Sequence, residues 1–245
     1  MPFHFVLFIV FMSFFPGLVL AVKSPLLDEA NRSQEEIEIL EHCSQYAKFY
    51  ELPPGADIWE ITEDLFDSPY VAEIRKQSLR DFGRRVFVFI YPSDGLRVKG
   101  LISFVPNPSE YSTLVFFRGG TQIFGLLNPG SDFMCAEQYT VISTAYRGGV
   151  SEGEDEYGGQ DVNDVKNLID FIPHLEQRLN AIFQKEKMHF LGGSRGGMQM
   201  FLALVRFPEL QTRVAKIVSL SGMLDMRQCL ATRPDMKTMF IKSLV

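Results

Sequence analysis

A serine flanked by glycines is the residue of this chain whose setting best suits covalent chemistry. The segment Gly192-Gly193-Ser194-Arg195-Gly196-Gly197 contains Gly-x-Ser-x-Gly, follows an apolar run at 187–191 and opens a helix-like run at 195–207. A serine on such a strand-to-helix turn is typical of a nucleophile elbow. Ser194 is the predicted nucleophile, and the N–H of Arg195, at the helix start, is a predicted oxyanion donor. The alternative is a glycine-rich turn with an idle serine.

Two glycines after an earlier apolar run predict a second oxyanion donor. Arg118-Gly119-Gly120-Thr121 comes directly after the run at 113–117. Glycines at a strand end let backbone N–H groups approach a ligand closely. We expect the Gly119-Gly120 loop to complete an oxyanion hole, against the alternative of an ordinary glycine turn.

The histidines supply no evident base for Ser194, although a serine hydroxyl needs one within about 3 Å. The chain has four histidines, and none follows Ser194. His189 lies five residues earlier on a predicted strand, about 16 Å back, and His174 lies about 20 Å along a helix that leads away. His4 belongs to the apolar N-terminus. His42 is left as a remote candidate, and the base stays unassigned.

Asp225 is the candidate acid, because it comes just past the predicted strand at 214–220. Without a histidine it has nothing to orient, so a loop or helix-cap role is the favoured alternative. Arg147 can pair with a carboxylate of the acidic loop at 152–156, or with Asp161 or Asp164 at a helix start.

No metal site and no organic cofactor is expected. The acidic loop Glu152-Gly153-Glu154-Asp155-Glu156 lacks the ligand spacing of a calcium loop. The three cysteines are too few and too far apart for a disulfide framework or a zinc site.

The elements that must position these residues alternate between strand and helix. Residues 84–106 predict a hairpin around a Ser93-Asp94-Gly95 turn. Short apolar strands are then predicted at 113–117, 139–145, 187–191 and 214–220. Helices are predicted at 161–178 and 195–207, with a shorter one near 132–138. Apolar strands separated by helices predict an α/β fold, with a mostly parallel sheet covered on both faces.

The N-terminal part divides into two segments. Residues 5–15 (FVLFIVFMSFF) are apolar and precede Val19-Leu20-Ala21, which predicts a signal peptide over 1–21. The mature protein is then secreted or periplasmic. The alternative is an uncleaved anchor, the only case in which a membrane is a partner. Residues 22–83 predict a helical lead-in, with a second helix that starts at Ser68-Pro69 and ends at Gly83.

Together these motifs resemble the α/β-hydrolase superfamily, and within it the prolyl oligopeptidase-like serine peptidases and their dienelactone-hydrolase-like relatives. The resemblance covers about residues 85–240 and rests on the hairpin turn, Arg118-Gly119-Gly120, Tyr146-Arg147-Gly148-Gly149, EGEDEYGGQDVNDV, GGSRGG and SLSGMLD. It implies that Ser194 cleaves a peptide or a small acyl substrate through an acyl-enzyme, with Arg195, Gly119 and Gly120 around the oxyanion. Post-proline peptidases tend to have tyrosine where this chain has Arg118 and Arg195, so proline specificity is not implied.

The family order of serine, acid and then histidine leaves two interpretations open. The favoured one is that 84–245 is an incomplete hydrolase domain whose C-terminal strands are missing. The other is a complete, non-catalytic relative that binds ligands. In either case we expect little or no turnover; an esterase for small acyl substrates is a further alternative.

Composition excludes other classes of protein. The chain has 245 residues, with 24 Lys and Arg against 30 Asp and Glu, for a net charge of −6. No basic stretch is available to neutralise phosphates, so nucleic acid is not an expected partner. A hydrophobic content of 46% excludes a disordered chain.

Overall fold

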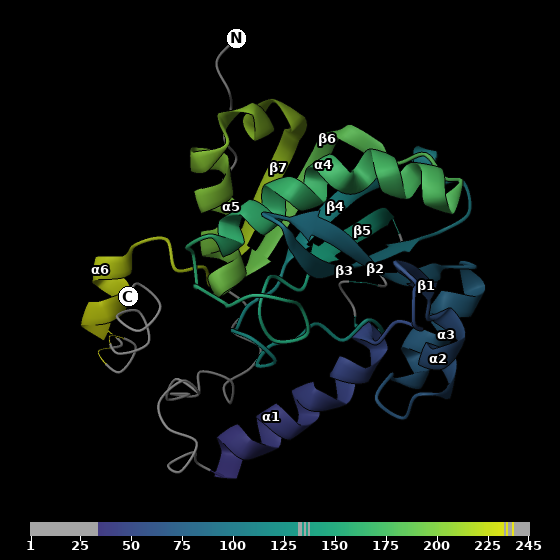
Figure 1. Ribbon diagram of the computed structural model, residues 1–245, viewed down its shortest axis with the longest axis horizontal. Helices are drawn as coiled ribbons and strands as arrows, with labels where there is room; N and C mark the ends of the chain where they lie inside the picture. The colour runs from purple at the N-terminus through teal and green to yellow at the C-terminus, as the bar shows by residue number, and fades with distance from the viewer. Residues whose placement is uncertain are drawn as a thin grey trace.

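The computed structural model describes residues 34–131, 134, 136, 138–232, 234 and 237. Its core is a seven-stranded sheet with helices on both faces (Figure 1). The strands are β1 (Ile58–Glu60), β2 (Arg85–Ser93), β3 (Leu96–Phe104), β4 (Ser112–Phe117), β5 (Tyr139–Thr144), β6 (Gln184–Gly193) and β7 (Val214–Leu220). The helices are α1 (Gln34–Ala47), α2 (Thr62–Asp67), α3 (Glu73–Asp81), α4 (Asp161–Leu179), α5 (Arg195–Arg206) and α6 (Met226–Thr232), with 3₁₀ turns η2 (Lys48–Tyr50), η3 (Pro108–Glu110) and η4 (Pro208–Arg213).

The sheet is mixed, in the order β1-β2-β3-β5-β4-β6-β7. The first three strands pair antiparallel, and β3 pairs antiparallel with β5. The strands β5, β4, β6 and β7 are parallel to one another. The predicted α/β class, hairpin, four strands and two long helices are confirmed.

The hairpin turn follows from two residues that accept a left-handed backbone. Asp94 has φ 50° and Gly95 has φ 81°, between the paired residues Ser93 and Leu96. A two-residue Asp-Gly loop with both φ values positive matches the twist of the flanking strands. The turn therefore sets the register of the whole β2–β3 pair.

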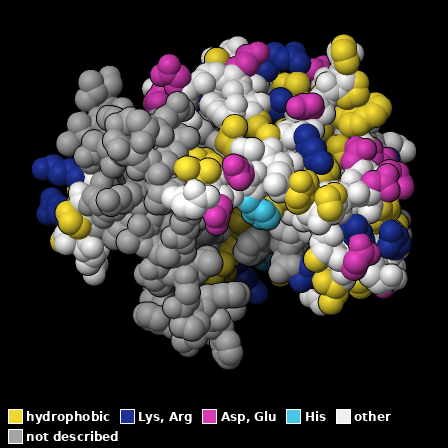
Figure 2. Space-filling model, turned by 90° about the horizontal axis from the view of Figure 1, so that it is seen from below, with side chains coloured by type: hydrophobic (Ala, Val, Ile, Leu, Met, Phe, Trp, Pro, Cys, Tyr) yellow, Lys and Arg dark blue, Asp and Glu magenta, His cyan; other side chains and the backbone are white. Residues whose placement is uncertain are grey.

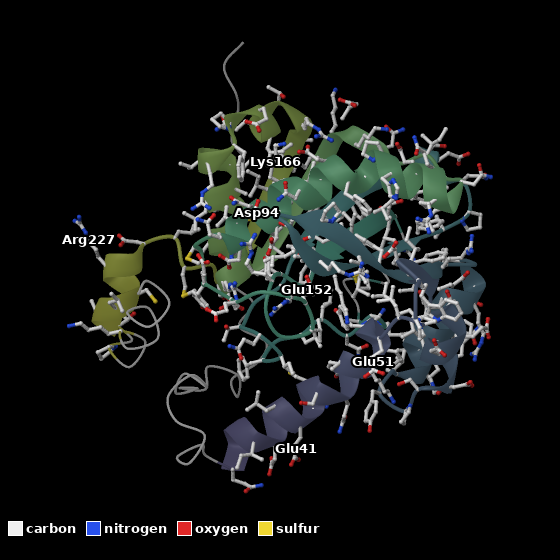
Figure 3. The ribbon with its side chains drawn as sticks, in the orientation of Figure 1. Glu41, Glu51, Asp94, Glu152, Lys166 and Arg227 are labelled. Atoms are coloured by element: carbon white, nitrogen blue, oxygen red, sulfur yellow. The ribbon has the colours of Figure 1, made fainter. Side chains whose placement is uncertain are left out.

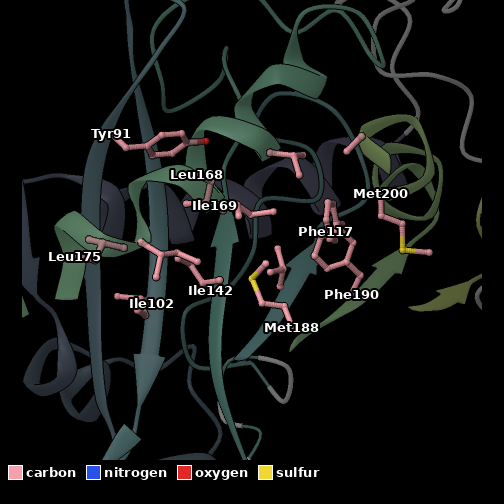
Figure 4. Close-up of a cluster of buried hydrophobic side chains, with 14 of the residues drawn as sticks. Tyr91, Ile102, Phe117, Ile142, Leu168, Ile169, Leu175, Met188, Phe190 and Met200 are labelled. Atoms are coloured by element: carbon pink, nitrogen blue, oxygen red, sulfur yellow. The ribbon is translucent and has the colours of Figure 1, made fainter. Parts of the chain in front are cut away.

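Each face of the sheet carries its own hydrophobic core. Successive residues of β2 point to opposite faces, so Phe87 and Phe89 join one cluster while Val86 and Val88 join the other. Figure 4 shows the first cluster, in which Leu168, Ile169 and Leu175 of α4 cover the strands. The second cluster packs the lead-in on the opposite face, with members Tyr46, Phe49, Tyr50, Leu65 and Leu79.

The lead-in differs from the sequence prediction in two places. It contains a strand, β1, which pairs with β2 and extends the sheet. The predicted helix start at Ser68-Pro69 is wrong: Ser68 follows the end of α2, and α3 begins at Glu73. The predicted stop is confirmed, because Gly83 takes φ 57° just past the end of α3. The predicted signal peptide lies outside the described residues, as does most of the short helix expected at 132–138.

The topology marks one place at the sheet's carboxyl edge. The neighbouring strands β4 and β6 send their chains in opposite directions, β4 to β5 and β6 to β7. In open parallel sheets, ligands bind in the crevice at such a switch point. The loops after β4 and β6 carry Gly119-Gly120 and Ser194, the residues chosen from the sequence. Among the described helices, none combines the length and the apolar character needed to span a bilayer.

Candidate active site

Ser194 stands exposed at the turn between β6 and α5. Its backbone has φ 51° and ψ −120°, a conformation that side-chain-bearing residues avoid. The N–H of Ser194 donates to the carbonyl of Leu220 at 2.9 Å, which ties the turn to the end of β7. The geometry is that of a nucleophile elbow, with the hydroxyl at the carboxyl end of the sheet.

Close backbone contacts explain the glycine that follows the serine by two residues. A Cβ placed on Gly196 would lie 1.9 Å from the carbonyl oxygen of Phe117, at the end of β4. No side chain fits there without moving the backbone. The absence of a side chain lets α5 begin directly against β4, and this brings Ser194 to the loop that follows β4.

The Gly119-Gly120 loop lies against Ser194. A Cβ added to Gly119 would lie 3.3 Å from the Cβ of Ser194, and Gly120 has φ 66°. As a residue of the first turn of α5, Arg195 has a backbone N–H with no acceptor inside the helix. The structure thus brings Ser194, the N–H of Arg195 and the Gly119-Gly120 loop together, as the sequence placed them.

The side chain of Arg195 is buried in an ion-pair network. Its Nη2 lies 2.6 Å from Oδ1 of Asp155 and also pairs with Asp161, and its Nη1 donates to Oδ2 of Asp155 at 2.7 Å. Although burial alone raises the pKa of Asp155, the Arg195 guanidinium holds it below its usual value. Asp155 also accepts from the hydroxyl of Thr121 and the N–H of Gln122, so the acidic loop is fastened to the loop after β4.

A second buried arginine, Arg118, holds the same loop from the other side. Its guanidinium donates to the carbonyls of Gly119, Gln122 and Ala145. The ring of Tyr146 lies 5.2 Å from the guanidinium carbon of Arg118 and 4.9 Å from that of Arg195. Burial and the nearby Arg195 charge lower the pKa of Arg118.

The partner of Arg147, left open by the sequence, is Asp164, with Asp94 as a second partner. Nη2 of Arg147 lies 2.8 Å from Oδ1 of Asp164 and 2.7 Å from Oδ2 of Asp94. Figure 3 labels Asp94 at the hairpin turn beside α4, where Asn163 also donates to it. Burial raises the pKa of Asp164 despite the ion pair. This cluster joins the hairpin to α4 and is separate from Ser194.

The three described histidines have partners away from Ser194. His42 is hydrogen-bonded to Tyr46 within α1, and His174 packs on the ring of Phe171 on α4. His189 lies within β6, edge-on to the ring of Tyr139. The base therefore remains unassigned.

Asp225 caps the start of α6. Its Oδ1 accepts from the N–H groups of Arg227 and Gln228 at 2.9 and 3.1 Å. Figure 3 shows Arg227 on α6, which stands away from the body of the molecule. This is the helix-cap alternative, and the role of acid stays a prediction.

The acidic loop is engaged with protein groups. Asp155 binds Arg195, and Glu156 accepts from the N–H of Gln160 at 2.7 Å. Within the described ranges, no group of three or more His, Cys, Asp and Glu side chains has an arrangement that could hold a metal ion.

Sequence reasoning missed the linkage of Arg195, Asp155 and Arg118. Arg118 contacts Ala145, 27 positions away, and Arg195 contacts Gly120, 75 positions away. No local spacing in the sequence reveals contacts of this range. The one available signal was the occurrence of arginine, in place of tyrosine, beside both glycine motifs.

Comparison with known proteins finds a relative that matches part of the chain. Over 157 residues the chain is 32% identical to a protein named uncharacterized peptidase YtmA, from Bacillus subtilis (strain 168). The match covers 63% of this chain and 58% of that relative, so the chain spans less than two thirds of the relative's length. No protein-family model matches the chain.

Solved structures show the same architecture at low identity. The rice cell wall degrading esterase LipA from Xanthomonas oryzae matches with a TM-score of 0.51 and 15% identity, over 65% of this chain and 49% of that one. A putative hydrolase from Legionella pneumophila matches with a TM-score of 0.52 and 13% identity, over 70% of this chain and 57% of that one. By its sheet order, its elbow and its likeness to these solved structures, the chain has the α/β-hydrolase fold.

Proposed function

We propose that this chain is a serine hydrolase of prolyl oligopeptidase-like type, in which Ser194 attacks a peptide or ester carbonyl. The observation that carries the proposal is the position of Ser194: strained, exposed, at the head of α5 and against the Gly119-Gly120 loop. The relative named as a peptidase favours the peptide substrate. The resemblance to an esterase fold leaves small acyl esters as the second candidate.

The reaction would pass through an acyl-enzyme. The Ser194 oxygen forms a bond to the substrate carbonyl carbon while a base takes the hydroxyl proton, and the carbonyl oxygen becomes an oxyanion. The N–H of Arg195 and those of the Gly119-Gly120 loop stabilise that charge. The leaving amine or alcohol departs with a proton, and water then releases the acid.

We propose that turnover by this chain is low. The support is that each described histidine has a partner elsewhere, and a serine without a base loses most of its reactivity. A role in binding alone is the outcome if Ser194 proves unreactive.

Export also remains a proposal, together with the secreted or periplasmic location. It rests on the apolar run at 5–15 and the small-residue pattern that ends at Ala21.

A fluorophosphonate probe tests the nucleophile directly. We expect slow labelling of the full chain, lost in Ser194→Ala. Ser221→Ala is the matched control, because Ser221 is another exposed serine with φ 51° at a strand end; this variant should label like the parent. Labelling that persists in Ser194→Ala, or a parent that is not labelled, would overturn the assignment.

Substrates then separate the finer proposals. Prolyl peptides and short acyl esters should both be turned over poorly, and the preferred class is read from the ratio of their kcat/KM values. Rapid turnover of either class would contradict the proposed low activity.

A further inference from the structure

We propose that Arg118 and Arg195 are positioning residues, which lock the Gly119-Gly120 loop in the orientation that an oxyanion hole needs. The inference rests on the proposed function for its catalytic meaning. Its structural content, a loop clamped by two guanidinium groups, stands on the contacts alone.

Arg118 fixes the carbonyl of Gly119. Its Nη1 donates to that oxygen at 3.1 Å, and its Nε and Nη2 donate to the carbonyl of Ala145 at 3.0 and 2.6 Å. Nη2 also reaches the carbonyl of Gln122 at 3.1 Å. One planar side chain therefore joins both ends of the loop to the end of β5.

Arg195 fixes the next carbonyl. Its Nη1 donates to the oxygen of Gly120 at 2.8 Å, while Asp155 binds both terminal nitrogens and Asp161 binds Nη2. Because Arg195 directly follows Ser194, the loop is tied to the residue beside the nucleophile.

Two held carbonyls define two N–H directions. A trans peptide is planar, and its N–H points opposite to its C=O. With the oxygen of Gly119 held by Arg118, the N–H of Gly120 faces the other way. With the oxygen of Gly120 held by Arg195, the N–H of Thr121 also faces the other way, toward Phe124, with which Thr121 forms an isolated β-bridge. The arginines thus set the N–H directions in a loop that contacts Ser194 through Gly119, and they leave the N–H of Gly120 as the candidate donor.

Buried charge is a poor way to gain stability, which favours a positioning role. The two arginines are among the largest fully buried side chains, and Asp161 is also buried. Removing charges from water offsets most of the gain from an ion pair. A fork of five donors, however, holds several carbonyls in fixed directions, which a compact ammonium does not.

The test compares loop dynamics and Ser194 reactivity in the full chain. The variants are Arg118→Met and Arg195→Met, with Arg118→Lys and Arg195→Lys as second variants that retain the charge if the methionine variants fail to fold. Arg84→Met is the matched control. Arg84 is also buried and also binds carbonyls, those of Ala136 and Tyr139, but it lies outside the site.

Two readouts are needed. Hydrogen exchange of peptides spanning 118–126 reports the loop, with the β2–β3 hairpin as the reference for global opening. The rate of phosphonylation at Ser194 reports the oxyanion hole. We expect loop exchange at least about tenfold faster and labelling about tenfold slower in the methionine variants, since misplaced donors cost roughly that or more. The lysine variants should keep fast loop exchange with less global loss, whereas Arg84→Met should change the loop and the labelling less than about twofold relative to its hairpin reference.

The outcomes distinguish a failure of the positioning role from a failure of the proposed hydrolase function. If loop exchange in the Arg118 and Arg195 variants matches that of Arg84→Met, the positioning role is refuted. If the parent is not labelled, the proposed function fails, yet the exchange measurement still decides whether the arginines clamp the loop. If lysine at both positions restores parental loop exchange, charge alone suffices and the fork geometry is not the cause.

Discussion

The backbone of Ser194 is strained and is held in place by its neighbours. A side-chain-bearing residue in such a backbone conformation costs of order 1–3 kcal/mol. Its N–H is held by Leu220, and its carbonyl accepts from the N–H of Gly197 at 3.0 Å. The surrounding strands and helix therefore impose the conformation on an exposed hydroxyl.

His189 is a second residue whose surroundings matter more than its type. It lies on β6 between Leu114 of β4 and Lys216 of β7, with the ring of Tyr139 edge-on. Its Nδ1 is buried without a hydrogen-bond partner. Burial, with the Lys216 charge as a smaller cause, lowers the pKa of His189.

The lowered pKa predicts a specific pH dependence of stability. Below the usual value of 6.5, the unfolded chain binds a proton that the folded chain resists. The contribution of His189 is therefore fully present above that value and is lost as pH falls toward the folded pKa. In His189→Phe, which keeps the ring against Tyr139, the free energy of unfolding should decline less steeply between about pH 7 and pH 5. Denaturant titrations across this range measure it.

His174→Phe is the control, since His174 stands exposed on α4 and its replacement removes a histidine without removing a burial cost. It should keep the parental slope. Parallel pH curves for His189→Phe and the parent would contradict the prediction.

At the scale of elements, α4 contains a proline in its interior, where the geometry of a helix disfavours it. Pro173 lies in the interior of this 19-residue helix and is exposed. Proline has no N–H for the carbonyl four residues back, and its ring crowds that carbonyl. Pro208, in contrast, begins η4, where a fixed φ is favourable.

Substitution of these two prolines by alanine should change the free energy of unfolding in opposite directions. Pro173→Ala should raise the free energy of unfolding by about 1 kcal/mol, because the restored helix bond outweighs the added freedom of the unfolded chain. Pro208→Ala should lower it by about 0.5 kcal/mol, because only that freedom changes. Equilibrium denaturation of both variants is the measurement. Equal signs would show that local helix geometry does not decide either effect.

The elements that sequence predicted are those with long or regular patterns. The hairpin combines two alternating strands with an Asp94-Gly95 turn, and the four apolar strands form short continuous hydrophobic runs. Both patterns can be recognised within a short stretch of sequence. By contrast, β1 has three residues, and only its pairing with β2 makes it a strand. Ser68-Pro69 has the composition of a helix start, but the backbone there closes α2 before α3 begins.

The same distinction between local patterns and long-range contacts applies to the candidate site. Ser194 and the Gly119-Gly120 loop could be proposed from the sequence, because the residues that mark an elbow and a close-approach loop are adjacent in the chain. The arginine clamp was not found, because the side chain of Arg195 meets Gly120 and Asp155 only after three strand ends are brought together. The partner of Arg147 was undecidable for the same reason.

For the whole molecule, the sheet edges and the surface charge decide how copies meet. Figure 2 shows acidic and basic side chains interspersed with apolar ones over the described part of one face. The net charge of −6 keeps copies apart at long range. At short range the relevant feature is β7, an end strand of the sheet in the described part of the chain, where no residue is fully buried.

An end strand that the described residues leave partly exposed predicts association between copies, because its outer row of backbone groups accepts another strand. The parent should therefore associate as its concentration rises, as sedimentation velocity would show. Val218→Lys should shift this association to concentrations higher by about tenfold, since a charge on an edge strand opposes pairing. Val205→Lys is the matched control: Val205 is 75% exposed, but it lies on the helix α5 and not on a sheet edge. Equal effects of the two lysines would show that surface charge alone controls association. A parent that stays monomeric would contradict the prediction that β7 mediates association.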